Sequence, residues 1–380
     1  MSGDPTLAMS IPAVPSSLLE RYDAQHLRAR TAISSLKPRA QRLTKAWLRA
    51  RMTESLAGLR ASWFGRSDPP IIPTPRGFLG AESRERLAGI QRALDHVQTR
   101  IQGTSDRRSE NLIGWETPFV LHALATSATA SPGARVAIFR SSPSGWADDH
   151  HAYRPPPPSD VPAIVAATLH RLAGAADEHP AVLAAWFACA FMTIHPFEDG
   201  NGRTARLLHL LISSAALDGE LDHGIAEMWM VHRTGYHERL RAVEGRSPNY
   251  DPQILDARPF VEATLDWSAA GAALTAARAD VVAYLDASLP GSDEVREAAA
   301  AALLENGTTP ERLLAGPYGE QVDALERAVT AGLVLRSPRP PSRRNQAGAR
   351  AKPWYVPTGG ALRIFHDVLT GSRHEGDRPL

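Results

Sequence analysis

The sequence predicts a mainly α-helical protein with a short β-hairpin and a C-terminal module of winged-helix type. Three observations predict this fold class. Apolar residues recur at helical spacing over much of the chain, the uncharged run Ala181 to Ile194 is typical of a central buried helix, and short β-prone runs flank turn-forming segments. With 380 residues the chain has room for more than one structural unit.

The first segment is expected to be a basic helical extension over residues 1–75. Apolar residues recur at helical spacing from Ser16 to Phe64, with a break at Pro38. Glu20 to Arg66 holds eleven Lys and Arg against three Asp and Glu. This charge suits nucleic acid, a membrane surface or an acidic partner, and equally a solvated helical face whose apolar side docks on the core. The proline-dense stretch 67–77 predicts the boundary.

A central helical domain is expected over residues 76–270. It begins with an amphipathic helix over 81–101. Within residues 135–154, the runs RVAIFR and HHAYR flank the turn-forming SSPSGWADD, which predicts the β-hairpin. Asp160 is placed to cap the next helix. The run 181–194 is expected to form the buried centre of this domain.

A C-terminal winged-helix-like module is expected over residues 271–380. Helices predicted near 275–287, 293–305 and 319–331 precede the strand-like runs LVLR and WYVP. The basic loop between these runs would be the wing, and its cations are Arg336, Arg339, Arg343, Arg344, Arg350 and Lys352. Such modules bind DNA or dock proteins, and the sequence leaves both uses open.

The composition excludes several kinds of site. Cys189 is the only cysteine, so neither a disulfide framework nor a cysteine-rich zinc site forms within one chain. No uncharged apolar run approaches the length of a membrane span, and the N-terminus lacks a signal-peptide pattern, so we expect a cytoplasmic protein without membrane contact. His209, His223 and His232 match no common zinc spacing, so solvent-facing or capping roles are expected for them.

The chemistry-bearing segment is IHPFEDGNGRTARLL, residues 194–208, a glycine-rich turn between two helices. His195 ends the apolar helix, where its imidazole suits a general base near neutral pH. Asp199 supplies a carboxylate that can hold Mg²⁺ together with phosphate oxygens and waters. We therefore expect a base and a metal ligand in the same turn.

The same turn predicts a phosphate cradle. Gly200 and Gly202 permit positive φ angles, so the backbone around Asn201 can point successive N–H groups at an anion. The helix that follows adds the positive end of its dipole. Arg203 and Arg206, at i,i+3 spacing, place two guanidiniums beside the same point.

The run HPFEDGNGRTAR resembles the signature of the Fic family, H-P-F-x-[D/E]-G-N-G-R-x-x-R, at every constrained position. The resemblance implies a Fic-type helical domain in which the 135–154 hairpin is a flap that docks a target protein. It also implies that Phe197 anchors the turn in the core and that Tyr236 lies on the adenine side of a bound nucleotide.

The resemblance implies a protein adenylyltransferase that transfers AMP from Mg-ATP to a Ser, Thr or Tyr hydroxyl of a target protein. His195, Asn201 and Arg203 would be catalytic, and Asp199 would bind Mg²⁺. The implied nucleotide- and phosphate-binding residues are Gly200, Asn201, Gly202, Arg203, Arg206 and Tyr236. Because the family's kinase-like branch replaces the second glycine with a bulkier basic residue, Gly202 favours AMP transfer.

Other readings stay open. The same fold could transfer another phosphate-containing group or remove AMP, and the chain could act as a DNA-associated regulator through its C-terminal module. The run DRRSEN resembles the family's autoinhibitory pattern [S/T]-x-x-x-E-[G/N] and makes Glu110 the candidate autoinhibitory residue, which would pair with Arg206. It departs from the pattern because Asp106 stands at the Ser/Thr position.

Overall fold

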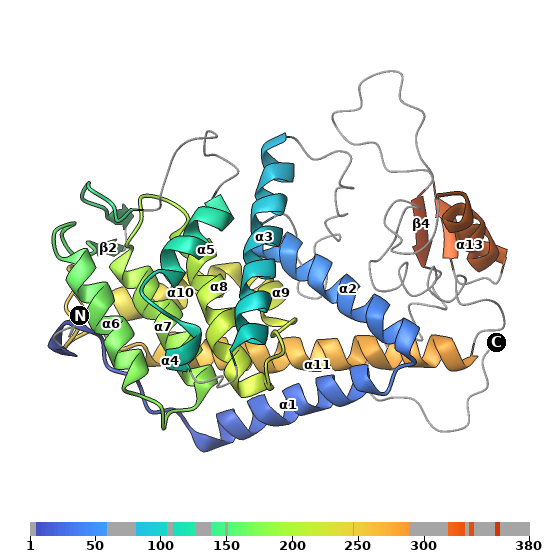
Figure 1. Ribbon diagram of the computed structural model, residues 1–380, viewed down its shortest axis with the longest axis horizontal. Coiled ribbons are helices and arrows are strands. Elements are labelled where there is room, and N and C mark those ends of the chain that lie inside the picture. Colours follow the sequence, from blue (N-terminus) through green and yellow to red (C-terminus); the bar gives the residue numbers. More distant parts are fainter. Residues whose placement is uncertain are drawn as a thin grey trace. The chain divides into compact units, whose positions relative to one another are not determined.

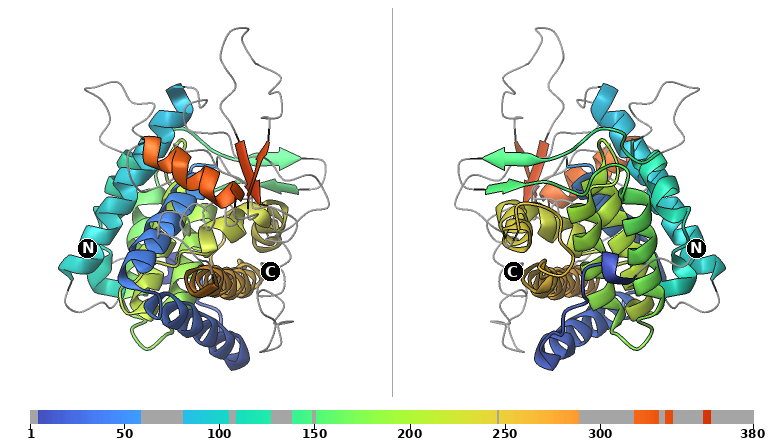
Figure 2. Two further views of the ribbon diagram at one scale, coloured as in Figure 1. Left: turned by 90° about the vertical axis from the view of Figure 1, so that its right-hand side faces the viewer. Right: turned by 90° about the vertical axis from the view of Figure 1, so that its left-hand side faces the viewer.

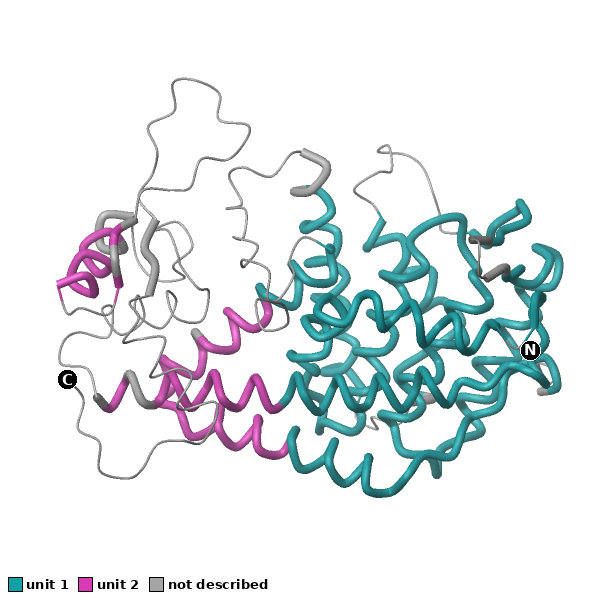
Figure 3. The backbone as a smooth tube through the Cα atoms, turned by 180° about the vertical axis from the view of Figure 1, so that it is seen from behind, with its two compact units in different colours: residues 1–26, 50–71, 79–272 teal, residues 27–49, 72–78, 273–380 magenta. Residues whose placement is uncertain are grey.

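The computed structural model describes residues 5–58, 81–104, 109–126, 138–148, 151–245, 247–288, 318–330, 334–337 and 354–357 (Figure 1). This part of the chain is mainly helical, which confirms the predicted class. The chain divides into two compact units, one of residues 1–26, 50–71 and 79–272 and one of residues 27–49, 72–78 and 273–380 (Figure 3). The expected domain boundaries at 75/76 and 270/271 stay predictions.

Two helices form the centre of the first unit. Helix α7 (Pro180–Ile194) is buried along almost its whole length because its sequence offers no polar face. Helix α8 (Asn201–Ser213) packs against α7 and also against α5 (Thr117–Thr126) and α3 (Ala81–Gly103). On another side of α7 lies α6 (Val161–Ala173). The turn that joins α7 to α8 is therefore held by the most deeply packed pair of helices.

The remaining helices of the described chain are shorter or peripheral, with one long exception, α11. Their bounds are η1 (Pro5–Leu7), α1 (Ser16–Ser34), α2 (Pro38–Leu56), α4 (Ser109–Leu112), η4 (Ser214–Leu217), α9 (Ile225–Val231), α10 (Arg233–Glu244) and α11 (Arg258–Ser288). Asp160 occupies the N-cap position of α6, but its side chain makes no capping hydrogen bond, so the expected cap is wrong in that detail.

The N-terminal helices begin as predicted, with Pro38 as the first residue of α2. Part of the basic charge expected to face solvent or a partner is internal. Arg51 is buried and paired with the equally buried Glu227 of α9, with Nε 3.2 Å from one carboxylate oxygen and Nη2 bonded to the other. This pair fixes the end of α2 within the first unit.

The β-hairpin lies within the expected segment 135–154, but its first strand falls in the stretch expected to form the turn. Strand β1 (Trp146–Asp148) pairs antiparallel with β2 (His151–Tyr153) (Figure 2). In this register Trp146 lies opposite Tyr153. The expected first strand, RVAIFR, is not extended into this ladder where it is described, at residues 138–140. The reason is a competing partner: the Arg140 N–H donates to the Pro196 carbonyl at 2.9 Å, in the turn after α7.

In the second unit, α13 (Tyr318–Thr330) packs against β3 (Val334–Ser337), which pairs antiparallel with β4 (Trp354–Pro357). The expected helix at 275–287 is the end of α11. The helix expected at 293–305 and the wing residues Arg339, Arg343, Arg344, Arg350 and Lys352 lie outside the described residues. Arg336 is exposed, 3.6 Å from Glu326, and the winged-helix module stays a prediction.

Within the described ranges, none of the helices combines the length and the apolar character needed to cross a membrane.

Two glycines let α11 approach the start of α9 at backbone distance. A Cβ on Gly271 would lie 2.6 Å from the carbonyl carbon of Gly224, and a Cβ on Gly224 would lie 2.2 Å from that of Gly271. Because both obstacles are backbone atoms, neither can rotate away. The contact therefore requires glycine at both positions.

We expect Gly271→Ala to lower the free energy of unfolding by about 1–3 kcal/mol through overpacking, although alanine favours helix. Chemical denaturation followed by circular dichroism measures this change. Gly103→Ala, at the exposed end of α3 where a Cβ meets nothing within 4 Å, is the control and should change the stability by less than about 0.5 kcal/mol. Equal stability of both variants would contradict the close approach.

Candidate active site

The turn between α7 and α8 is bounded by two residues in left-handed conformation. His195 ends α7 with φ 51° and ψ 59°, and its N–H donates to the Phe191 carbonyl at 3.0 Å. Gly200 is the N-cap of α8 with φ 80°. A non-glycine residue in this region costs roughly 1–2 kcal/mol, so the surrounding contacts must hold His195 there.

Asn201 braces the turn from inside. Its side-chain Oδ1 accepts from the Phe197 N–H at 2.9 Å, and its Nδ2 donates to the Phe197 carbonyl at 2.7 Å. Asn201 is 2% exposed, so both ends of the amide are used in a buried position. The side chain therefore holds the turn, and the catalytic role expected for Asn201 stays a prediction.

Phe197 anchors the turn in the core, as the resemblance implied. Its ring is 1% exposed and lies between aromatic rings of three segments. The nearest are His122 at 3.9 Å, Phe119 at 5.7 Å and Phe191 at 5.9 Å between ring centroids. Pairs of this kind add roughly 0.5–1.5 kcal/mol beyond the burial of their area.

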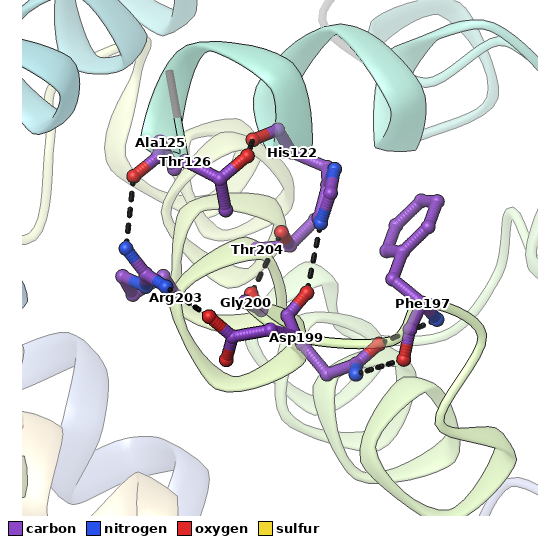
Figure 4. A network of polar contacts seen from close by, with 9 residues as sticks. His122, Ala125, Thr126, Phe197, Asp199, Gly200, Arg203 and Thr204 are labelled. Atoms are coloured by element: carbon purple, nitrogen blue, oxygen red, sulfur yellow. Dashed lines mark hydrogen bonds and ion pairs between the residues drawn. The ribbon is translucent and has the colours of Figure 1, made fainter. Parts of the chain in front are cut away.

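One face of α5 forms the platform under the turn. Phe119, His122 and Thr126 follow i, i+3, i+7 spacing and all three reach the turn. The His122 Nε2 lies 2.8 Å from the Asp199 carbonyl oxygen, and a Cβ on Gly200 would lie 2.5 Å from Cγ2 of Thr126 (Figure 4). Gly200 is therefore required twice, for its positive φ and for the close approach of α5.

Arg203 ties the metal candidate to this platform. Its Nη2 donates to Asp199 Oδ2 at 3.0 Å and its Nη1 to the Ala125 carbonyl at 3.1 Å (Figure 4). The Asp199 side chain is 88% exposed, so its other oxygen faces solvent. A surface pair of this kind contributes little stability, and its value here is that it orients both groups.

Gly202 does not have the positive φ expected for it. It lies within the first turn of α8, and Gly200 is the one glycine of the turn in left-handed conformation. A Cβ on Gly202 would lie 3.3 Å from Nη1 of Arg206. Glycine at this position therefore leaves space around the Arg206 guanidinium, which is a steric reason rather than a conformational one.

Tyr236 is 5% exposed and packs edge-on against Phe260 at 5.2 Å. Its expected place on the adenine side of a nucleotide stays a prediction. Burial raises its pKa to about 12, and the neighbouring Arg206 guanidinium opposes that rise. Tyr236 therefore supports Arg206 from the core side of α8.

The environment of His195 favours its neutral form. Burial lowers the pKa of the imidazole below its usual 6.5, and the positive charge of Arg140 lowers it further. A backbone hydrogen bond with Met192 and the carboxylates of Asp199 and Glu198 act in the opposite direction. An imidazole that stays neutral near physiological pH can accept a proton.

Three contacts around the turn were not predicted from the sequence. Arg140 is buried and donates from Nε to the His195 carbonyl at 2.8 Å. Tyr153 of β2 donates to the Thr193 carbonyl at 3.1 Å. His122 bonds Asp199 as described above. The i, i+3 spacing of Phe119 and His122 on α5 was a signal for His122 alone, and no sequence pattern marks the other two.

Glu198 is held by the segment before β1, and His209 departs from expectation. Glu198 is exposed, yet its Oε1 accepts from the N–H groups of Ser141 and Ser142 at 3.1 and 3.2 Å, and these hydrogen bonds lower its pKa. His209, expected to face solvent or cap a helix, is 2% exposed and packs edge-on against Trp229. Burial lowers its pKa to about 4, so it is neutral in the core.

Glu110 lies in α4, but its side chain is outside the described residues, so the autoinhibitory assignment stays a prediction. Within the described ranges no group of three or more His, Cys, Asp or Glu side chains is placed to hold a metal ion. Asp199 offers a single outward carboxylate. That donor set suits Mg²⁺ bound chiefly by substrate phosphates and waters, which needs only one or two protein oxygens.

Comparison with known proteins assigns this region. Residues 118–213, from α5 to the end of α8, match the family model described as the Fic/DOC family. None of the curated protein sequences matches the chain.

The solved structures that resemble this chain include three Fic proteins. One is a Fic family protein from Desulfovibrio desulfuricans G20, with 17% identity and a TM-score of 0.49, covering 92% of this chain and 98% of that one. One is a Fic domain-containing signaling protein from Bacteroides thetaiotaomicron, with 16% identity and a TM-score of 0.49, covering 68% and 98%. The third is Fic-1 from C. elegans, with 17% identity and a TM-score of 0.46, covering 72% and 74%.

The brace on Phe197 can be tested directly. We expect Asn201→Ala to lower the free energy of unfolding by about 2–4 kcal/mol, because it leaves a buried N–H and a buried carbonyl unpaired. Asn201→Asp keeps the acceptor for the Phe197 N–H and should lose less. Urea denaturation of the three proteins measures the difference. Wild-type stability in Asn201→Ala would show that the amide does not hold the turn.

Proposed function

Since residues 118–213 form a Fic domain, we propose that the chain is a protein adenylyltransferase, which moves AMP from Mg-ATP to a hydroxyl side chain of a target protein. The observation that carries this proposal is the convergence of four groups on one turn. A neutral histidine, an outward carboxylate, a helix N-terminus and two arginines lie within residues 195–206.

His195 acts as the general base in this proposal. It takes the proton of the target hydroxyl, and the hydroxyl oxygen forms a bond to the α-phosphorus of ATP. The bond from that phosphorus to the oxygen bridging to the β-phosphate breaks, and pyrophosphate leaves. Burial and the charge of Arg140 keep the imidazole in the form that accepts the proton.

The phosphates are held by the start of α8. Gly200, with its positive φ, turns the first N–H groups of the helix outward, where the helix dipole favours negative charge. Arg203 and Arg206 lie in the first turns of this helix, and the positive charge of Arg203 acts on Arg206, so both add positive potential beside the helix N-terminus. These cations stabilise the charge that develops as pyrophosphate leaves.

Asp199 is the residue that would hold Mg²⁺, with the rest of the coordination from phosphate oxygens and waters. The ion, when bound, neutralises phosphate charge and orients the leaving group. His122 and Arg203 hold Asp199 from its backbone and its side chain, so the carboxylate is oriented before the metal arrives.

Two features favour AMP transfer and a protein target. Gly202 leaves open the space beside Arg206 that a larger residue would fill. The β1–β2 ladder lies in the segment whose neighbouring residues contact His195, so a peptide paired with it would approach the base. A target peptide that pairs through its main chain needs only a short strand, so the three-residue strands β1 and β2 are long enough to dock it.

The roles proposed for His195 and Arg203 predict different effects of substitution on nucleotide binding and on turnover. His195→Ala should abolish transfer while the dissociation constant for Mg-ATP changes less than about twofold, because the base acts on the hydroxyl and not on the nucleotide. Arg203→Ala should weaken nucleotide binding about 10-fold or more and also lower turnover, because a charge-assisted bond to phosphate acts in both states.

Calorimetry of Mg-ATP binding and mass spectrometry of modified protein measure the two effects. Arg239→Ala, an exposed arginine on α10, is the charge control and should match wild type in both. Loss of nucleotide binding in His195→Ala would contradict the base role, and unchanged affinity in Arg203→Ala would contradict the phosphate role.

A further inference from the structure

Arg140 is a buried arginine whose guanidinium donates to three carbonyl oxygens. Nε donates to His195 at 2.8 Å, Nη1 to Ser142 at 3.0 Å, and Nη2 to Pro156. The residue is 3% exposed. Burial of a charge is costly unless its donors are fully used, and the planar guanidinium fork is the side chain that can reach three acceptors at once.

The first of these acceptors belongs to the proposed base. The His195 carbonyl lies past the last turn of α7, where helical carbonyls lack intrahelical partners. His195 is in left-handed conformation, and its carbonyl accepts a hydrogen bond from Nε of Arg140. The Arg140 backbone N–H also donates to the Pro196 carbonyl at 2.9 Å. One residue therefore fixes two consecutive peptide groups that set the direction of the imidazole.

The other two acceptors flank the hairpin. Ser142 precedes β1 and Pro156 follows β2, so the guanidinium joins both ends of the hairpin segment to the end of α7. Glu198 secures the same segment from outside by accepting from the hydroxyl of Ser142 at 2.8 Å. The segment that would dock a target is thus bonded to the residue that would deprotonate it.

We propose that Arg140 is a positioning residue that couples the hairpin segment to His195, so that docking of the target hydroxyl and orientation of the base depend on one guanidinium. This inference rests on the proposed nucleotide transfer. It adds a residue outside the glycine-rich turn to the machinery of the reaction and assigns it a role in turnover, not in nucleotide binding.

The electrostatic surroundings provide a second readout. Burial lowers the pKa of His195, the positive Arg140 lowers it further, and a backbone hydrogen bond with Met192 and the carboxylates of Asp199 and Glu198 raise it. Removal of the Arg140 charge should therefore raise the imidazole pKa. Because the base must be neutral, the acid limb of the rate profile should move to higher pH.

The test compares Arg140→Lys, which keeps the charge and loses the fork, with Arg140→Gln, which loses the charge. Both should lower kcat for AMP transfer about 100-fold, with Mg-ATP affinity within about twofold of wild type. NMR titration of the His195 ring should give a raised pKa in Arg140→Gln and a nearly unchanged one in Arg140→Lys. Arg239→Gln, an exposed arginine on α10, should match wild type in every measurement.

Wild-type kcat in both Arg140 variants, or an unshifted His195 titration in Arg140→Gln, would overturn the inference. If wild-type protein transfers nothing, the proposed function fails, and the titration still decides whether Arg140 acts on His195. If the Arg140 variants do not fold, Glu198→Ala loosens the same segment from an exposed position. It should lower kcat about 10-fold at unchanged nucleotide affinity, and wild-type kcat would again refute the coupling.

Discussion

The reversal of the chain between α7 and α8 is the constraint on which the site depends. Helix α7 has no polar face, so it can only lie in the core, and its end fixes where His195 emerges. The Asn201 amide then holds the Phe197 backbone at both its N–H and its carbonyl, which sets the start of α8. The proposed base and the proposed phosphate-binding end of α8 are thus positioned by the same buried turn.

Neighbouring elements hold this reversal from two sides. On one side, α5 contacts the turn through His122 and Thr126 and orients Asp199. On the other, the segment around the hairpin bonds the end of α7 through Arg140 and Tyr153. His122, Arg140 and Tyr153 each form a hydrogen bond with a backbone carbonyl in the turn or at the end of α7. The groups of the proposed site are therefore oriented without a bound ligand, as the proposed electrostatic catalysis requires.

The sequence predicted the elements and the residues of the turn because these depend on local pattern. The apolar run gave α7 to within one residue of its start, and the glycines and arginines marked the start of α8. The sequence did not predict contacts between residues that are far apart in the chain. Arg140 was read as part of a strand because β-propensity cannot show that its backbone pairs with Pro196.

The same limit applies within the site. The resemblance implied a catalytic role for Asn201, but the sequence did not show that its amide holds the Phe197 backbone. The resemblance placed Tyr236 on the adenine side, and no spacing rule contains its packing against Phe260. Gly202 was expected to need a positive φ, whereas its role is to leave space at Arg206.

The most direct test of the account is incubation of the purified protein with Mg-ATP labelled either at the α-phosphate or at the γ-phosphate. Label is scored on the protein itself and on lysate proteins, with His195→Ala in parallel. The account predicts that α-label alone becomes protein-bound and that the His195 variant abolishes it. Transfer of γ-label would instead identify a kinase, and α-labelling that persists without His195 would contradict the central role of the base.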